Sequence, residues 1–292
     1  MTAMLADLVR TPDWFNQALA VEARAASTVV DGAKIAYRTW GEGTRSVILI
    51  HGGAAHSRWW DHIAPLLGEG REVIALDLSG HGESDFRESY SVDRWAAEVL
   101  AVAGLASSAA PILIGHSLGG VVGLRAAMAS GAKLGGIIIV DSPLVHFTPE
   151  EDAAADRLAF GPPRLYPTRE SVVSRFRPIP DQLTLDYVAT HVANTSVREV
   201  PGGWSWKFDL KIFDRAPQLP ELIPLACQSA FFRGENGLVG TDMADEIFRR
   251  LGSATPMIEV PAAGHHPMLD QPLALVAGLR TLLAAWEHQP TA

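Results

Sequence analysis

The sequence has little cysteine, and the little it has cannot form a disulfide within the chain. Its single cysteine is Cys227. A fold stabilised by internal disulfides needs at least two cysteines, and such folds belong to oxidising compartments. A secretory signal is also missing, because residues 1–10 include Asp7 and do not run from basic to apolar. We therefore expect a cytoplasmic protein.

Long apolar runs and an excess of positive charge are absent as well. Hydrophobic residues make up 48% of the 292 residues, yet no apolar stretch approaches the roughly 20 residues of a membrane-spanning helix. Aspartate and glutamate (33) outnumber lysine and arginine (24), giving a formal net charge of −9. Nucleic-acid-binding proteins carry concentrated basic faces instead. The expected partner is a small-molecule substrate, with neither nucleic acid nor a membrane, and a homodimer is compatible with this composition.

Short apolar runs alternate with helical patterns along most of the chain. This alternation is typical of a mostly parallel sheet covered by helices on both faces. The Asp31-Gly32 pair predicts the turn of a hairpin joining 28–30 to 34–39. Six buried strands are predicted over 47–50, 73–77, 112–115, 137–141, 229–233 and 257–260.

Two segments fall outside this alternation. Residues 13–23 have an amphipathic pattern and predict a helix within an N-terminal extension, 1–24. Residues 143–217 are rich in proline, arginine and aromatic side chains and show no clear buried strand. We interpret them as an inserted cap subdomain, which leaves 25–142 and 218–292 as one α/β core.

The pentapeptide Gly115-His116-Ser117-Leu118-Gly119 lies between an apolar run and a helical pattern rich in small residues. In this context GxSxG predicts a nucleophile elbow. Glycines are needed two residues before and after the serine, because a Cβ there would collide with the turn or with the neighbouring strand. The turn places Ser117 and the amide of Leu118 at a helix N-terminus, where an oxyanion is stabilised.

Two further glycine-containing segments follow predicted strands. His51-Gly52-Gly53-Ala54 follows the strand over 47–50, and the N–H of Gly53 is the expected second oxyanion donor. Residues 77–84 form a tight loop for which we expect a structural role. Ala263-Gly264-His265-His266 follows the last strand and supplies histidines after the nucleophile in the chain.

The segments HGG (51–53), DLSGHGES (77–84), GHSLGG (115–120) and AGHHPMLDQP (263–272) have the order and spacing of a known family. Through them the chain resembles the α/β-hydrolase fold superfamily, in its cap-bearing serine-esterase-like branch. The resemblance implies an α/β fold with a mostly parallel eight-stranded sheet flanked by helices, and an inserted helical cap after the sixth strand. It also implies a Ser–His–acid triad, with His265 as the histidine.

The position of the triad acid departs from the commonest family pattern. Many relatives carry Gly-x-x-Asp after the seventh strand, where this chain has Gly234-Glu235-Asn236-Gly237. Other relatives place the acid at the end of the sixth strand, where this chain has Asp141. A carboxylate there can reach the same imidazole from the adjacent strand, so we select Asp141. Glu235 and Asp242 remain alternatives, and Asp141 has a competing interpretation as a turn cap.

Other histidines in these segments have structural interpretations. We expect His116 to pack beneath the nucleophile, and His51 and His81 to brace glycine turns. The side chains of the adjacent His265 and His266 should diverge, and no HExxH or paired-cysteine motif occurs. We therefore expect no metal ion and no other cofactor.

Four tryptophans lie in two pairs, one after the oxyanion loop and one in the predicted cap. Trp59 and Trp60 are expected in the core, after the oxyanion loop. Trp204 and Trp206, at alternate positions in the cap, either anchor it or line a substrate-binding pocket.

The predicted chemistry is acyl transfer to water through an acyl-enzyme on Ser117, with His265 as general base. Serine at the elbow argues against haloalkane dehalogenases and cap-bearing epoxide hydrolases, because both need a carboxylate nucleophile. The aromatic cap favours a small or medium, largely apolar ester, thioester or lactone. The alternatives are a C–C bond hydrolase or a cofactor-free perhydrolase on the same fold, and a non-catalytic ligand-binding protein.

Overall fold

The computed structural model describes residues 11–144, 164–214, 222–223, 225–252 and 255–288. The first ten residues of the predicted extension and the predicted boundary at 217–218 lie outside these ranges.

One sheet of eight strands forms the centre of the molecule, in the order β1-β2-β4-β3-β5-β6-β9-β10. β2 pairs antiparallel with β1 and with β4, and the other five pairings are parallel, which confirms the predicted mostly parallel sheet. The six predicted buried strands are all present, with ends shifted by at most two residues. The strands are β1 (Arg24–Val30), β2 (Ala33–Trp40), β3 (Arg45–Ile50), β4 (Arg71–Leu76), β5 (Ile112–His116), β6 (Gly136–Val140), β9 (Gln228–Gly234) and β10 (Met257–Val260).

Both faces of the central strands are buried, which explains why each contains a run of apolar residues. Ile48 and Ile50 of β3 pack toward one face with residues of α3, α4 and α8, whereas Val47 and Leu49 pack toward the other with residues of α2, α9 and α10. The period of two along the strand divides the core into these two layers. The helices are α2 (Ala64–Leu67), α3 (Val92–Ala103), α4 (Leu118–Ser130), α8 (Thr241–Leu251), α9 (Pro267–Asp270) and α10 (Pro272–Glu287), with 3₁₀ turns η1 (Ser57–Trp60) and η2 (Gly131–Lys133).

The predicted hairpin and the predicted N-terminal helix are both present. Asp31 (φ 46°) and Gly32 (φ 77°) adopt the left-handed conformation that a tight two-residue hairpin turn requires. The helix, α1 (Asp13–Ala20), ends three residues before its predicted end. It buries Phe15 against Tyr187, with ring centroids 4.9 Å apart.

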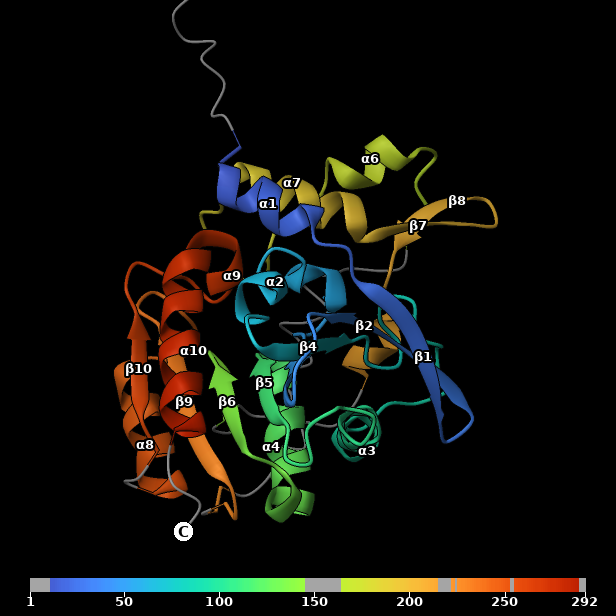
Figure 1. Cartoon of the computed structure of the whole chain (residues 1–292). Helices are drawn as coiled ribbons and strands as arrows, with labels where there is room; N and C mark the ends of the chain where they lie inside the picture. Colours follow the sequence, from blue (N-terminus) through green and yellow to red (C-terminus); the bar gives the residue numbers. More distant parts are fainter. Residues whose placement is uncertain (1–10, 145–163, 215–221, 224, 253–254, 289–292) are drawn as a thin grey trace, which may run out of the picture.

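The chain between β6 and β9 includes residues 164–214, which we call the inserted segment. Figure 1 shows it above the carboxyl ends of the central strands, with α1 beside α7. It contains α6 (Arg169–Val173), α7 (Asp186–Thr195), β7 (Val197–Val200), β8 (Gly203–Trp206) and η3 (Leu210–Phe213).

The inserted segment, for which a helical cap was expected, contains the β7–β8 hairpin as well as helices. The strands of this hairpin have four residues each, and most of those residues are only half-buried. Such short, half-buried strands lack the continuous apolar run by which the central strands were recognised.

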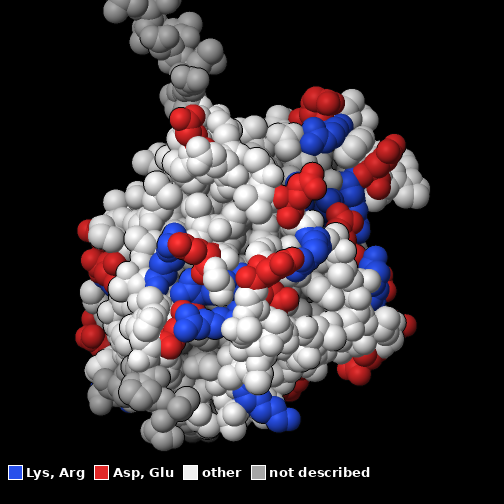
Figure 2. All heavy atoms as spheres, in the orientation of Figure 1, with Lys and Arg blue, Asp and Glu red and all other residues white. Residues whose placement is uncertain are grey.

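The surface mixes charges of both signs. Figure 2 shows acidic and basic side chains next to one another over the face drawn, and ion pairs such as Arg280–Glu69 (2.6 Å) join them. Within the described ranges, no helix combines the length and the apolar character that crossing a membrane would require.

Candidate active site

Ser117 lies between the last residue of β5 and the first residue of α4, in a backbone conformation that is rare for a residue with a side chain. Its φ is 52°. A Cβ on Gly115 would come closer than 3.0 Å to the carbonyl oxygen of Gly119, within the turn itself. A Cβ on Gly119 would come as close to the carbonyl oxygen of Ile50, on the neighbouring strand. The two glycines thus permit the tight turn that presents the serine side chain.

Ser117, His265 and Asp141 are joined by two hydrogen bonds. The Oγ atom of Ser117 lies 3.0 Å from Nε2 of His265, and Nδ1 of His265 lies 2.7 Å from Oδ2 of Asp141. A carboxylate only accepts hydrogen bonds, so Nδ1 carries the proton and Nε2 is free to accept the proton of the serine. His265 and Asp141 are both buried. This is the arrangement of a nucleophile, a general base and an orienting acid.

The Asp141 carboxylate is fixed by backbone groups of the neighbouring strand end. Besides His265, it accepts hydrogen bonds from the N–H of Gly234 (3.0 Å) and of Leu238 (2.9 Å). A Cβ on Gly237 would come closer than 3.0 Å to both Asp141 carboxylate oxygens. The carboxylate from β6 therefore fills the space that a side chain at 237 would take. This explains physically why the Gly-x-x-Asp pattern ends in glycine here.

The two alternative acids lie elsewhere. Glu235 accepts a hydrogen bond from the N–H of Ala262 (2.7 Å) at an exposed position. Asp242 lies in the exposed first turn of α8. Of the three carboxylates considered, the structure brings only Asp141 to His265.

The proposed oxyanion donors lie beside the nucleophile. Leu118 is the first residue of α4, so its N–H has no acceptor within the helix. A Cβ on Gly53 would lie 3.9 Å from Cδ2 of Leu118, and one on Gly52 would lie 3.3 Å from Cβ of Ser117. The loop after β3 thus packs directly against the elbow.

The loop at 77–84 and His51 brace this region. The Asp77 carboxylate accepts hydrogen bonds from the N–H groups of Ser57 (2.6 Å) and Glu83 (2.9 Å). Nε2 of His51 accepts one from the N–H of Leu78 (3.0 Å). Burial lowers the pKa of His51, which keeps it neutral. These contacts agree with a structural role for the 77–84 loop and for His51.

His116 and His266 pack around His265, contrary to the expectation that the adjacent histidines diverge. Ring centroids lie 4.8 Å apart for His116–His265 and 4.6 Å apart for His265–His266. The three histidines each offer a ring nitrogen, and these atoms lie within 4.8 Å of one another, close enough to consider as ligands of one metal ion. The backbone explains the convergence: His266 is the N-cap of α9, with φ −109° and ψ 74°, and does not continue an extended strand.

One ring nitrogen of His116 and one of His266 already donate hydrogen bonds to backbone carbonyls. Nε2 of His116 donates to the carbonyl of His265 (2.8 Å), and Nε2 of His266 donates to the carbonyl of Ile179 (3.0 Å). Burial, together with the charge of His265, lowers the pKa of His266 to about 3. Burial also holds the pKa of His116 well below its ordinary value. Both rings are therefore neutral supports for His265.

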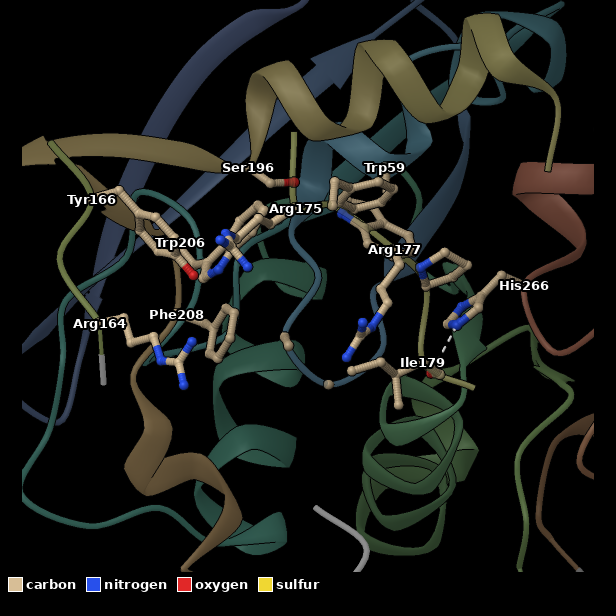
Figure 3. A pocket seen from close by; sticks show the side chains of 14 residues that line it. Trp59, Arg164, Tyr166, Arg175, Arg177, Ile179, Ser196, Trp206, Phe208 and His266 are labelled. Atoms are coloured by element: carbon tan, nitrogen blue, oxygen red, sulfur yellow. Dashed lines mark hydrogen bonds between the residues drawn. The ribbon is translucent and has the colours of Figure 1, made fainter. Parts of the chain in front are cut away.

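A cavity of about 300 Å³ opens between the inserted segment and the loop after β3. Gly53, Ala54, Trp59 and His266 contribute its wall from the core. The inserted segment contributes aromatic side chains, Trp206 among them, as Figure 3 shows.

The tryptophans divide between two environments. Trp206 and Trp59 line the cavity, and Trp59 is buried as well. Trp60 is buried in the core as expected. Trp204 instead pairs by backbone hydrogen bonds with Tyr166 within the inserted segment.

Three arginines of the inserted segment, Arg164, Arg175 and Arg177, also line the cavity. Sequence reasoning did not assign them to the site. The arginine-rich composition of the segment was the available signal, but composition does not show which side chains face a cavity.

A second serine–histidine contact lacks the features of a triad. Nε2 of His56 lies 2.9 Å from Oγ of Ser196, but this hydroxyl donates to the carbonyl of Val192 (2.7 Å). Nδ1 of His56 accepts from the N–H of Arg58 (3.3 Å) rather than donating to a carboxylate. This contact ties the inserted segment to the core.

Known proteins resemble this chain in sequence and in fold. A model of the alpha/beta hydrolase family matches residues 47–279. The esterase Rv0045c of Mycobacterium tuberculosis is 27% identical over 264 residues, covering 87% of this chain and 88% of its own. The pimeloyl-[acyl-carrier protein] methyl ester esterase of Edwardsiella ictaluri is 26% identical over 256 residues, covering 83% and 95%.

A similar fold occurs among solved structures. That of E-2-(acetamidomethylene)succinate hydrolase has a TM-score of 0.77 at 20% identity, covering 90% of this chain and all (100%) of that one. The family match spans most of the chain, from β3 into α10, and includes Ser117, His265 and Asp141. The chain therefore belongs to the alpha/beta hydrolase family.

Proposed function

We propose that the protein is a serine hydrolase that cleaves a carboxylic ester or thioester through an acyl-enzyme on Ser117. The observation that carries the proposal is the continuous chain of hydrogen bonds from Ser117 through His265 to Asp141, at 3.0 and 2.7 Å. The two curated relatives named above are both esterases, which supports the same class of reaction.

The proposed mechanism follows from the placement of each group. Nε2 of His265 accepts the proton of Ser117 as Oγ attacks the substrate carbonyl, and Asp141 stabilises the imidazolium that forms. The N–H groups of Leu118 and Gly53 stabilise the tetrahedral oxyanion. His265 then protonates the leaving group, and water repeats the sequence on the acyl-enzyme.

The inserted segment is proposed to act as a cap. Its position over the carboxyl ends of the strands and its share of the cavity wall support this role, because ligands of open α/β sheets bind at that edge. It would then determine which acyl and alcohol groups reach Ser117.

Active-site labelling tests the proposal. A fluorophosphonate should label the wild-type protein at Ser117, and Ser117→Ala should lose both the label and ester hydrolysis, by about 10⁴–10⁶-fold in turnover. The side chain removed is small and partly exposed, so the variant should stay folded by circular dichroism.

Ser89→Ala is the matched control, because it removes an exposed serine hydroxyl that does not line the cavity. It should keep the label and turnover within a few-fold of the wild type. A wild-type protein that neither labels nor hydrolyses any ester, thioester or lactone of a small panel would favour the ligand-binding alternative.

A further inference from the structure

The described lining of the cavity next to the oxyanion loop is positively charged, whereas the chain as a whole is negatively charged. The chain carries a formal net charge of −9. Among its described residues, however, the cavity lining includes Arg164, Arg175 and Arg177 and no aspartate or glutamate. A charged lining of one sign in an oppositely charged protein indicates a ligand of complementary charge.

These arginines differ in their partners from most of the described arginines elsewhere. Exposed arginines such as Arg24, which pairs with Glu42 at 2.9 Å, are compensated by a nearby carboxylate. Within the part of the chain that the structure describes, none of the three cavity arginines forms an ion pair. Arg94, Arg169 and Arg198 also lack an ion pair there, but each has another partner: a backbone carbonyl for Arg94 and Arg169, and the Phe86 ring for Arg198. The side chains of the three cavity arginines are exposed, so a ligand can reach them.

The backbone that carries each arginine is held in place. Arg164 lies two residues before Tyr166, which exchanges two backbone hydrogen bonds with Trp204 (2.9 and 2.8 Å). The N–H of Arg175 donates to the carbonyl of Val172 (3.0 Å) at the end of α6. Arg177 lies two residues before Ile179, whose carbonyl accepts a hydrogen bond from His266. The backbone positions of the three arginines around the cavity are therefore defined.

The cavity extends from these arginines to neighbours of the proposed catalytic residues Ser117 and His265, which are not themselves in its lining. Its core wall is formed partly by Gly53, the proposed oxyanion donor, and by His266, the neighbour of the proposed base. Figure 3 shows Arg164 and Arg177 extending into the space from opposite sides, with Arg175 beside Trp206. A substrate with its carbonyl at the oxyanion loop would direct its other end toward guanidinium groups.

The structure assigns a substrate class on this basis, given the serine hydrolase proposed above. We infer that the protein prefers an ester or thioester that carries an anionic group, a carboxylate or a phosphate, one short chain away from the scissile carbonyl. The planar guanidinium fork binds both kinds of anion in a bidentate manner. Aromatic walls such as Trp206 would pack along the chain between anion and carbonyl. The cavity volume suits a small ligand. This inference differs from the sequence-based expectation of a largely apolar substrate.

Matched substrates test the inference. One pair places the charge on the acyl side: the mono-4-nitrophenyl ester of adipic acid and 4-nitrophenyl hexanoate. A second pair places it on the alcohol side: 4-acetoxybenzoate and its methyl ester. Wild-type kcat/KM should favour the anionic member of at least one pair, by about 10-fold or more. The preference should shrink as salt is added, because the arginines are exposed.

Single Arg164→Gln, Arg175→Gln and Arg177→Gln variants identify the groups responsible. At least one should lose about 3- to 30-fold in kcat/KM for the anionic ester while keeping that for the neutral ester. Arg177→Glu should reverse the preference if Arg177 contributes. Arg24→Gln removes an equally charged, exposed side chain outside the cavity lining and should change neither value. Inhibition by hexanoate and by hexyl phosphate would show which anion is bound more tightly.

The outcomes separate this inference from the proposed function. Equal turnover of charged and neutral esters, unchanged in all three glutamine variants, would overturn the inference and leave the serine hydrolase intact. Absence of fluorophosphonate labelling and of turnover on every ester would overturn the proposed function itself.

Discussion

At the scale of single residues, the Asp141 carboxylate is where the chain departs most from the commonest pattern of its relatives. If it orients His265, Asp141→Asn removes the charge that fixes the imidazole tautomer while keeping the side-chain volume. We expect kcat to fall by about 10⁴-fold, by analogy with other triads. Glu235→Gln, the control at the alternative position, should stay within a few-fold of the wild type because its partner is the exposed amide of Ala262. Steady-state kinetics on one activated ester compares the two, and a larger loss in Glu235→Gln would contradict the assignment.

Gly237 allows a test of whether catalysis requires a carboxylate at this point in space, whichever strand end supplies it. A side chain at 237 would occupy the volume now filled by the Asp141 carboxylate. The double variant Asp141→Gly/Gly237→Asp should therefore recover about 10-fold or more of the kcat lost in Asp141→Gly alone. Gly237→Ala in the wild-type background should itself be impaired, because its Cβ displaces the carboxylate. A double variant no better than Asp141→Gly would show that the backbone at 237 cannot direct the acid to His265.

Variants of His265 and His266 should differ in the kinetic constant that they change, kcat for His265 and KM for His266. His265→Ala removes the proposed base and should lower kcat by about 10⁴-fold or more. His266→Asn removes a neutral ring that donates to Ile179 and lines the cavity, so it should act mainly on KM and on thermal stability. Single-turnover rates at one pH would rank the pair. A slower chemical step in His266→Asn than in His265→Ala would mean that the roles are exchanged.

At the scale of elements, the contact between α1 and α7 links the N-terminal helix to the inserted segment. Phe15 is buried against Tyr187 of α7 and also lies 5.5 Å, centroid to centroid, from His62. Phe15→Ala should lower the free energy of unfolding by about 3 kcal/mol, since it leaves a cavity at this junction.

Gln17→Ala provides the control on the same helix, because Gln17 is exposed. It should change stability by less than about 0.5 kcal/mol. Urea denaturation measures both variants. A Phe15→Ala variant as stable as the wild type would show that α1 packs only loosely on the inserted segment.

At the scale of the whole molecule, buried histidines should make the fold sensitive to acid. Burial lowers the pKa of His62 to about 4 and, with the charge of His265, that of His266 to about 3. The pKa values of His51, His56 and His116 are lowered as well, mainly by burial. In the unfolded chain these groups titrate near 6.5, so the unfolded state binds more protons below that pH.

Stability should therefore be greatest above pH 6.5 and fall as the pH drops toward 4. Each such histidine contributes about 1.4 kcal/mol per pH unit in that window. The raised pKa values of Glu98 and Asp270, caused mainly by burial, act in the opposite direction but involve fewer groups. Urea midpoints at pH 7, 6 and 5 should fall in order, and His62→Gln should show a shallower slope. A flat profile from pH 7 to 5 would contradict this account.

The sequence by itself determined the parts of this protein that depend on neighbouring residues. The parallel strands are recognisable because burial on both faces requires a continuous apolar run, as in β3 and β5. The elbow is recognisable because Gly115 and Gly119 satisfy a steric requirement of one turn. Asp31-Gly32 likewise specifies its hairpin by backbone conformation alone.

Only the tertiary structure decided which distant side chains meet. His265 and Asp141 are 124 positions apart, and their contact depends on the register of β6 beside β9, which sets where each strand ends. The same holds for the three arginines: their types are visible in the sequence, but their convergence on one cavity depends on how the inserted segment packs over the sheet. The steric requirements of a turn or a strand depend on a few neighbouring residues, so a short stretch of sequence shows them. Contacts between distant chain segments depend on how the whole core packs.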